Sequence, residues 1–159
     1  MFLSPQARGA GKGPIYMQTH YDRDAYAWAL EQASLLRAGK LDQIDIEHIA
    51  EEIESVGKSE RRALTSQLTR LFMHLLKWDH QPERRSRSWG ISVIDAQKKT
   101  ARILNDNPSL QASLDEIVTE AYEDARRAAA IETEMELETF PTEPLYSFEE
   151  AMSFAPESR

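Results

Sequence analysis

Residues 59–78 decide the fold, and they read SERRALTSQLTRLFMHLLKW. Their large apolar residues recur every three or four positions, which is the period of an amphipathic α-helix. This apolar stripe consists of Leu64, Leu68, Leu71, Phe72, Leu75 and Leu76. Pro82 follows and is incompatible with a continuing helix. The stretch therefore predicts one long helix that buries a leucine-rich face.

Similar stripes surround this segment and predict further helices over residues 22–38, 45–56, 88–104 and 108–133. Gly57 either ends the second of these helices or lies in a bend of one long helix. The run Ser147-Phe-Glu-Glu150 is a capping box, typical of the start of a short last helix. No segment alternates with the period of a strand, and only 6 glycines and 7 prolines are available for turns. The predicted fold is all-α, a compact bundle of five main helices plus a short C-terminal helix.

The predicted helix over residues 45–56 has a stripe of Ile46, Ile49, Ala50, Ile53 and Val56, which we expect to face the core. At about 100° per residue, His48, Glu51 and Glu52 then point away from the core. A metal site inside a bundle needs ligands that point inward, so this placement disfavours one here.

Composition limits the classes of function. The net charge is −8 and the sequence pI is about 5.1, so nonspecific binding to nucleic acid or to an anionic membrane is disfavoured. The longest apolar run has six residues, from Ala25 to Leu30, too few to span a bilayer. The chain has no cysteine, which fits a reducing compartment. We therefore expect a cytoplasmic protein that binds neither nucleic acid nor membrane.

The first residues differ from the rest. Residues 1–20 contain Pro5, Gly9, Gly11, Gly13 and Pro14 without any apolar period, which predicts a flexible leader. Met17, just before the first periodic segment, is an alternative start of the chain. The remaining residues, 21–159, are expected to form a single helical-bundle domain.

The segment between the third and fourth predicted helices, residues 77–89, carries the most distinctive chemistry. It holds four basic and two acidic residues within a chain of charge −8, and two of the three tryptophans flank it. Arginine side chains grip phosphates or carboxylates, and indoles stack on planar groups. The candidate partner- or anion-binding residues are Lys77, Trp78, His80, Arg84, Arg85, Arg87 and Trp89. The alternative is that these arginines only neutralise acidic side chains of their own scaffold.

The leading functional hypothesis is a non-enzymatic interaction module that binds an acidic or phosphorylated protein partner through this junction. Self-association, most simply as a homodimer, is also expected, because helices this amphipathic can bury a face against a second copy. The competing hypothesis is a metal- or small-ligand-binding bundle enzyme that uses His74, His80 and a glutamate. No Gly-x-Ser-x-Gly elbow and no glycine-rich phosphate loop support catalysis, and no cofactor is predicted.

Several short motifs resemble one known family. They are YAW at 26–28, QASLLRAG at 32–39, EEIE at 51–54, GKSERR at 57–62, HLLKW at 74–78, QPERRSRSW at 81–89, PSL at 108–110, AYEDA at 121–125 and FP at 140–141. Together they resemble the bacterial family called domain of unknown function 29, over about residues 21–154. The resemblance implies an all-helical fold and draws attention to the Lys-Trp to Arg-Ser-Trp stretch, without implying a reaction.

The chain departs from the family pattern in two places. Gly90 stands where a polar or basic residue is expected after the motif tryptophan. Glu132-Thr133-Glu134 stands where the family tends to have Glu-Thr-Gly, so a longer helix end is expected here.

Overall fold

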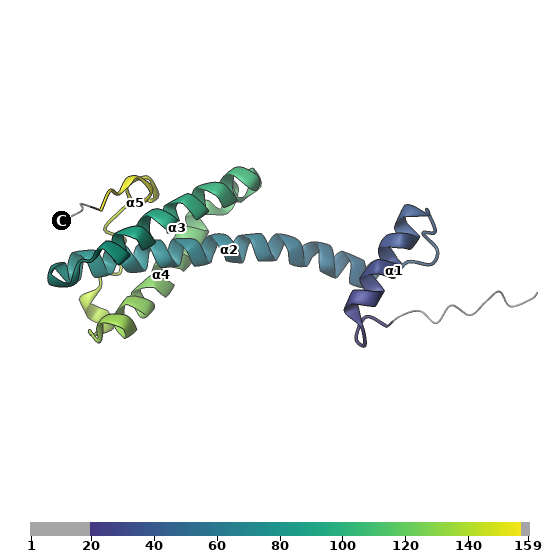
Figure 1. Ribbon diagram of the computed structural model, residues 1–159, viewed down its shortest axis with the longest axis horizontal. Coiled ribbons are helices and arrows are strands. Elements are labelled where there is room, and N and C mark those ends of the chain that lie inside the picture. Colours follow the sequence, from purple (N-terminus) through teal and green to yellow (C-terminus); the bar gives the residue numbers. More distant parts are fainter. Residues whose placement is uncertain (1–19, 157–159) are drawn as a thin grey trace, which may run out of the picture. The chain divides into compact units, whose positions relative to one another are not determined.

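The computed structural model describes residues 20–156. Its helices are α1 (Ala25–Arg37), α2 (Ile46–His80), α3 (Arg87–Asp106), α4 (Leu114–Thr133) and α5 (Phe148–Ser153) (Figure 1). Short 3₁₀ helices η1 (Pro82–Arg84), η2 (Pro108–Ser113) and η3 (Leu137–Thr139) lie between them. No strand occurs in the described residues, so the all-α prediction is confirmed. The predicted leader, apart from His20, and Met17 lie outside the described residues.

The boundaries of two helices differ from the expectation. Residues on both sides of Gly57 belong to the single helix α2, so the alternative of one long helix holds. Residues 108–113, expected to start the fifth main helix, form the 3₁₀ helix η2, which begins at Pro108. The short helix at Phe148 begins with the predicted capping box between Ser147 and Glu150.

The chain divides into two compact units, with residues 20–53 of the described chain in the smaller and residues 54–156 in the larger. In the smaller unit α1 ends at Arg37, and Gly39 follows two residues later with a φ of 68°, which suits a residue without a side chain. The Lys40 and Gly39 amides donate to the carbonyls of Leu35 and Leu36, a Schellman motif. Gly39 thus allows the chain to turn away at the C-terminal end of the first helix.

Polar and aromatic contacts hold the smaller unit together. The Trp28 indole N–H donates to Asp45 Oδ2 at 3.2 Å, and the Asp45 amide donates to Gln32 Oε1 at 2.7 Å. The rings of Tyr21 and His48 stack at 4.4 Å, and Tyr21 meets Trp28 edge-on at 4.8 Å. His48 was predicted to point away from the core. It is instead half-buried beside these two rings of the smaller unit.

Most of the apolar stripe expected to face the core from residues 46–56 is exposed instead, and only Ile49 is half-buried. Ile46, Ile53 and Val56 keep 65%, 68% and 65% of their surface exposed. The prediction that this stripe packs into the core of the chain is therefore wrong. A helical period shows which residues share a face, but not whether a neighbour covers that face.

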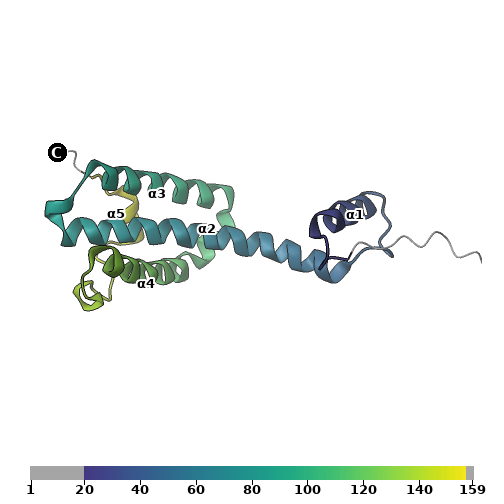
Figure 2. The same ribbon diagram turned by 60° about the horizontal axis from the view of Figure 1, so that its bottom comes forward.

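In the larger unit the second half of α2 lies between α3 and α4 (Figure 2). The predicted leucine stripe of residues 64–76 forms the centre of its core and is buried throughout. Further core residues are Val93 and Ala96 of α3, Ile117, Ala121, Tyr122, Ala125 and Ala129 of α4, Phe140, and Ala151 of α5.

Buried polar contacts attach the segment after α4 to this core. The buried Arg126 guanidinium donates to the Phe140 carbonyl through Nε at 3.2 Å and through Nη2 at 3.1 Å. The Tyr122 hydroxyl donates to the Pro141 carbonyl at 2.8 Å. These bonds satisfy the carbonyls of Phe140 and Pro141, which lie just after η3 and belong to no helix.

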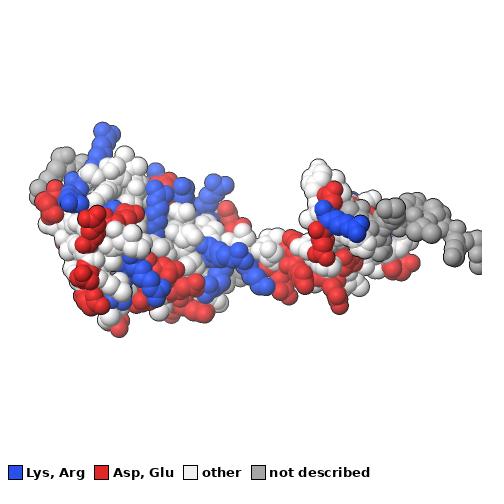
Figure 3. Space-filling model, turned by 90° about the horizontal axis from the view of Figure 1, so that it is seen from below, with Lys and Arg blue, Asp and Glu red and all other residues white. Residues whose placement is uncertain are grey.

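The surface carries charges of both signs. On the face in Figure 3, acidic side chains dominate the smaller unit, whereas acidic and basic side chains are mixed over the larger one. None of the helices in the described part of the chain is both long and apolar enough to cross a lipid bilayer.

Candidate functional site

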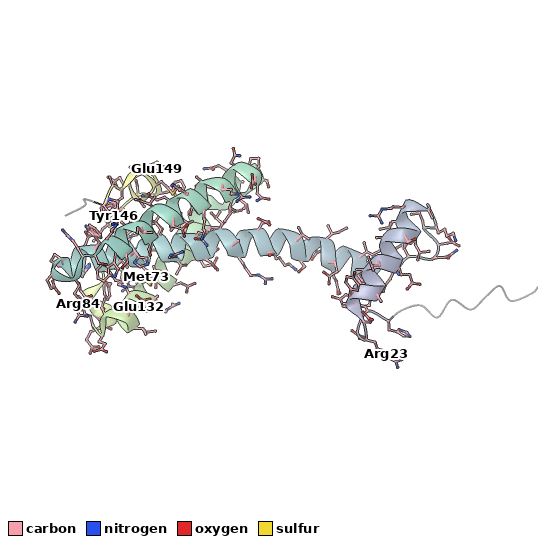
Figure 4. All side chains as sticks on the ribbon, viewed as in Figure 1. Arg23, Met73, Arg84, Glu132, Tyr146 and Glu149 are labelled. Atoms are coloured by element: carbon pink, nitrogen blue, oxygen red, sulfur yellow. The ribbon has the colours of Figure 1, made fainter. Side chains whose placement is uncertain are left out.

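The predicted junction between α2 and α3 is built from a short, tightly capped turn. Helix α2 ends at His80, and Pro82 occupies the first position of η1, where its missing N–H costs nothing. Ser86 then caps α3, since its hydroxyl accepts a hydrogen bond from the Trp89 amide at 3.3 Å. The turn brings the end of α2 and the start of α3 together and leaves Arg84 on the outside (Figure 4).

Lys77, one of the predicted site residues, makes contacts within the fold. Its side chain is buried, and its ammonium pairs with the Glu132 carboxylate of α4. The same ammonium lies 4.5 Å from the centroid of the Trp89 ring, within cation–π range. Lys77 and Trp89 thus bind each other across the α2–α3 junction.

Trp78 and Arg85 form a second pair. Arg85 Nε donates to the Trp78 carbonyl at 2.8 Å, and the guanidinium carbon lies 5.3 Å from the centroid of the indole ring. The buried Trp78 ring also meets Phe154 edge-on at 6.0 Å. Arg85 is therefore held by its Nε, which leaves its two terminal nitrogens for an external group.

His80 takes part in local packing. Its Nδ1 donates to the Leu76 carbonyl at 2.8 Å, and its ring lies 4.9 Å from that of Phe140. This contact attaches the last residue of α2 to the backbone one turn earlier in the same helix.

A cleft of about 710 Å³ opens beside the junction. It lies between the end of α2, the first turns of α3 and the segment that follows α5. Its lining residues are Trp78, Asp79, Arg85, Ser86, Arg87, Gly90, Ile91, Ile94, Phe154, Ala155 and Pro156. Of the seven predicted residues, Trp78, Arg85 and Arg87 line this cleft, whereas Lys77, His80, Arg84 and Trp89 do not.

The lining combines positive charge with exposed apolar surface. The side chain of Arg87 is exposed and has no ion-pair or hydrogen-bond partner among the described residues. Ile91 and Ile94 of α3 keep 57% and 42% of their surface exposed. Such a surface can bind a group that carries an anion next to an apolar part.

Asp79 is the one acidic residue of the lining, and Tyr146 engages it. The Tyr146 hydroxyl donates to the two carboxylate oxygens at 3.0 and 2.9 Å. Burial, followed by this hydrogen bond, raises the pKa of Tyr146 to about 12, so it remains a donor at neutral pH. Tyr146 precedes α5, near Glu149 (Figure 4).

The far wall of the cleft comes from the C-terminal segment, which sequence reasoning missed. Gln97 Nε2 donates to the carbonyls of Ala151 at 2.9 Å and Phe154 at 2.8 Å, and so attaches this segment to α3. A Cβ at Gly90 would approach Pro156 Cβ to 3.3 Å, so the glycine allows the segment to lie close. The departure from the family pattern at Gly90 was the one sequence signal for this wall.

The residues of the competing metal hypothesis do not come together. His74 is 8% exposed, and burial lowers its pKa to about 4. Its Nδ1 has no hydrogen-bond partner among the described residues, whereas His80 bonds the Leu76 carbonyl. Within residues 20–156, no group of three or more His, Asp or Glu side chains is arranged to hold a metal ion.

Comparison with known proteins places the chain in a family. The family model described as domain of unknown function DUF29 matches residues 20–155, most of the chain. Neither the curated proteins nor the solved structures contain a significant match. The matched region includes the junction, the cleft lining up to Ala155, and residues of both compact units. The chain therefore belongs to the DUF29 family.

Proposed function

We propose that the protein is a non-enzymatic interaction module, and that its junction cleft binds an acidic or phosphorylated segment of a protein partner. The observation that carries this proposal is the composition of the cleft, in which Arg85 and Arg87 border the exposed faces of Ile91 and Ile94. We assign the activity to a bacterial cytoplasm, in keeping with a chain that has no cysteine.

The two arginines supply the anion recognition. A guanidinium presents paired N–H donors that match the oxygens of a carboxylate or phosphate. Trp78 orients the guanidinium of Arg85 by contact with its ring and through its carbonyl. Because less freedom is lost when an oriented side chain binds, this arrangement favours affinity.

The apolar side of the cleft supplies the second part of the recognition. Ile91, Ile94 and Phe154 lie on the lining next to the arginines. A peptide with a bulky apolar residue beside its acidic or phosphorylated residue would bury these side chains, at about 25 cal/mol per Å² of apolar surface. The cleft volume also falls within the range of small-molecule sites, so a small organic anion is the second candidate ligand.

Titration with phenyl phosphate, followed by amide NMR shifts, tests the proposal. We expect shifts at residues 86–94 and 154–156, and none with the neutral analogue benzyl alcohol. Arg87→Glu should weaken binding about tenfold, since a charge-assisted hydrogen bond contributes roughly 1.5–3 kcal/mol. Lys98→Glu, an exposed charge change on α3 away from the cleft lining, is the matched control.

Two results would count against the proposal. One is the absence of shifts around the cleft at millimolar phenyl phosphate. The other is equal binding by the Arg87→Glu and Lys98→Glu variants. A serine peptide and its phosphoserine counterpart, each followed by leucine, then distinguish a peptide site from a site for small anions.

A further inference from the structure

The first half of α2 carries an apolar face that nothing in the described chain covers. Ile46, Ile53 and Val56 are each about two-thirds exposed. Their spacing along α2 places them on the same side of the helix as Leu64 and Leu71, which are fully buried. One continuous stripe is therefore covered in its second half and exposed in its first.

The smaller unit buries very little of itself. Among residues 20–53 only Trp28 and Gln32 are buried. Further large apolar side chains of this unit, beside those of α2, are exposed, namely Tyr26, Leu30, Leu36 and Leu41. A unit this small cannot build a sufficient core alone, and such units are normally completed by disulfides, metals or association with another chain. The chain has no cysteine, so a disulfide cannot supply the missing stability.

Gly57 is a second, independent observation. It lies in the interior of α2, where glycine is less favourable than alanine. A Cβ at this position would meet nothing within 4 Å, so packing within the chain does not require a glycine. Glycine in such a place permits the close approach of another backbone. Because the described residues supply none, the approaching backbone is expected to come from another chain.

The charged residues around Gly57 indicate which helix could approach it. One flank of the exposed stripe carries Glu47, Glu51 and Glu54 before Gly57, and Lys58 and Arg62 after it. Lys58 and Glu54 pair with each other at 3.3 Å, but both side chains are about two-thirds exposed, so this pair is free to exchange partners. Arg62 is exposed.

The order of charges along this flank, acidic and then basic, complements the same order in a second helix that runs in the opposite direction. In an antiparallel pair of identical helices, the same flank of each helix faces the other, so the acidic turns of one copy lie opposite the basic turns of the second. In a parallel pair this flank would instead face the opposite flank of the second copy, which carries Glu52 near the acidic turns and no acidic residue near the basic ones.

We propose that a second copy of this chain packs antiparallel against the exposed stripe of α2, with the two helices crossing near Gly57. The contact is the same patch on both copies, as a twofold dimer requires. It uses none of the residues that line the junction cleft, so it stands independently of the proposed function.

Sedimentation equilibrium of the full chain over a concentration series tests the proposal. We expect a dimer for the natural sequence. Gly57→Leu should raise the dimer dissociation constant at least about tenfold, because the added side chain separates the crossing helices, while leucine favours the helix itself. Helical circular dichroism verifies that this variant folds. The control is Ile131→Ser, which alters an exposed apolar residue of α4 outside the proposed interface.

Charge exchange tests the antiparallel orientation. Glu51→Arg and Arg62→Glu should each weaken the dimer, and the double variant should restore it to within about threefold of the natural affinity. A natural chain that remains monomeric at about 100 μM overturns the proposal. So does a Gly57→Leu chain that dimerises as tightly as the natural one, or a double variant that is no tighter than the single ones.

Discussion

His74 is buried, and its ring nitrogen Nδ1 has no hydrogen-bond partner among residues 20–156. Burial, followed by the positive charge of Lys77, lowers its pKa to about 4, against 6.5 in an unfolded chain. The unfolded chain thus binds the proton more readily than the folded one. The stability that this creates is complete above pH 6.5 and is lost as the pH falls toward 4.

We therefore expect His74→Gln to reduce the dependence of stability on pH. Between pH 7.5 and 4.5 the free energy of unfolding of the natural chain should fall by about 2 kcal/mol more than that of the variant. Urea unfolding at the two pH values measures this difference. Equal losses in both chains would show that the His74 ring is not the group responsible.

His48 behaves in the opposite sense. Its Nδ1 lies 2.7 Å from Asp45 Oδ2, and this hydrogen bond, against a smaller effect of desolvation, raises the pKa of His48 above 6.5. The stabilisation is present below pH 6.5 and is lost as the pH rises through the pKa of the folded state. In an NMR titration we expect Asp45→Asn to lower the pKa of His48. Asp42→Asn, an exposed change nearby, should leave the pKa unchanged.

Among the secondary-structure elements, α4 is followed by a residue with a strained backbone conformation. The helix ends at Thr133, and Glu134 follows with a φ of 57°, the left-handed region. The longer helix end expected from Glu134 is thus not formed. Left-handed backbone costs a residue with a Cβ about 1–2 kcal/mol, whereas glycine adopts it freely. The family tendency toward glycine here matches this geometry.

Glu134→Gly should therefore stabilise the protein by about 0.5–1 kcal/mol, less than the full strain, because glycine also gains freedom in the unfolded chain. Thermal or urea unfolding measures the change. The matched control is Glu136→Gly, since Glu136 has an ordinary φ of −63° and glycine there should only destabilise. Destabilisation by both substitutions would contradict the prediction.

The elements themselves were predictable to different degrees. The leucine period of residues 64–76 predicted a buried helical face correctly, because six large apolar residues at that spacing have one favourable arrangement. Gly57 left the continuity of α2 open, since an interior glycine costs a helix only about 1 kcal/mol and does not have to end it. Pro108 marked a boundary correctly, but whether a 3₁₀ or an α-helix follows depends on packing.

For the whole molecule, the all-helical bundle followed from scarce turn residues and helical periods. The junction could be identified in the sequence as a basic segment within an acidic chain. The cleft beside it could not be identified from the sequence. That cleft depends on Phe154 and Pro156, far along the chain from Trp78, and on Gly90, which lets Pro156 approach. Contacts of this sequence separation leave no periodic signal.

The unbroken course of α2 through both compact units has a consequence for how the chain acquires its structure. Starting a helix is unfavourable, because several residues must be ordered for the first hydrogen bond, whereas each further residue adds a bond of its own. Residues 46–57 would be marginal as an isolated helical peptide of that length. Joined to the leucine-packed half of α2, they need no nucleus of their own. We therefore expect the core of the larger unit to template the first half of α2, and we expect that half to melt progressively from Ile46 inward rather than all at once.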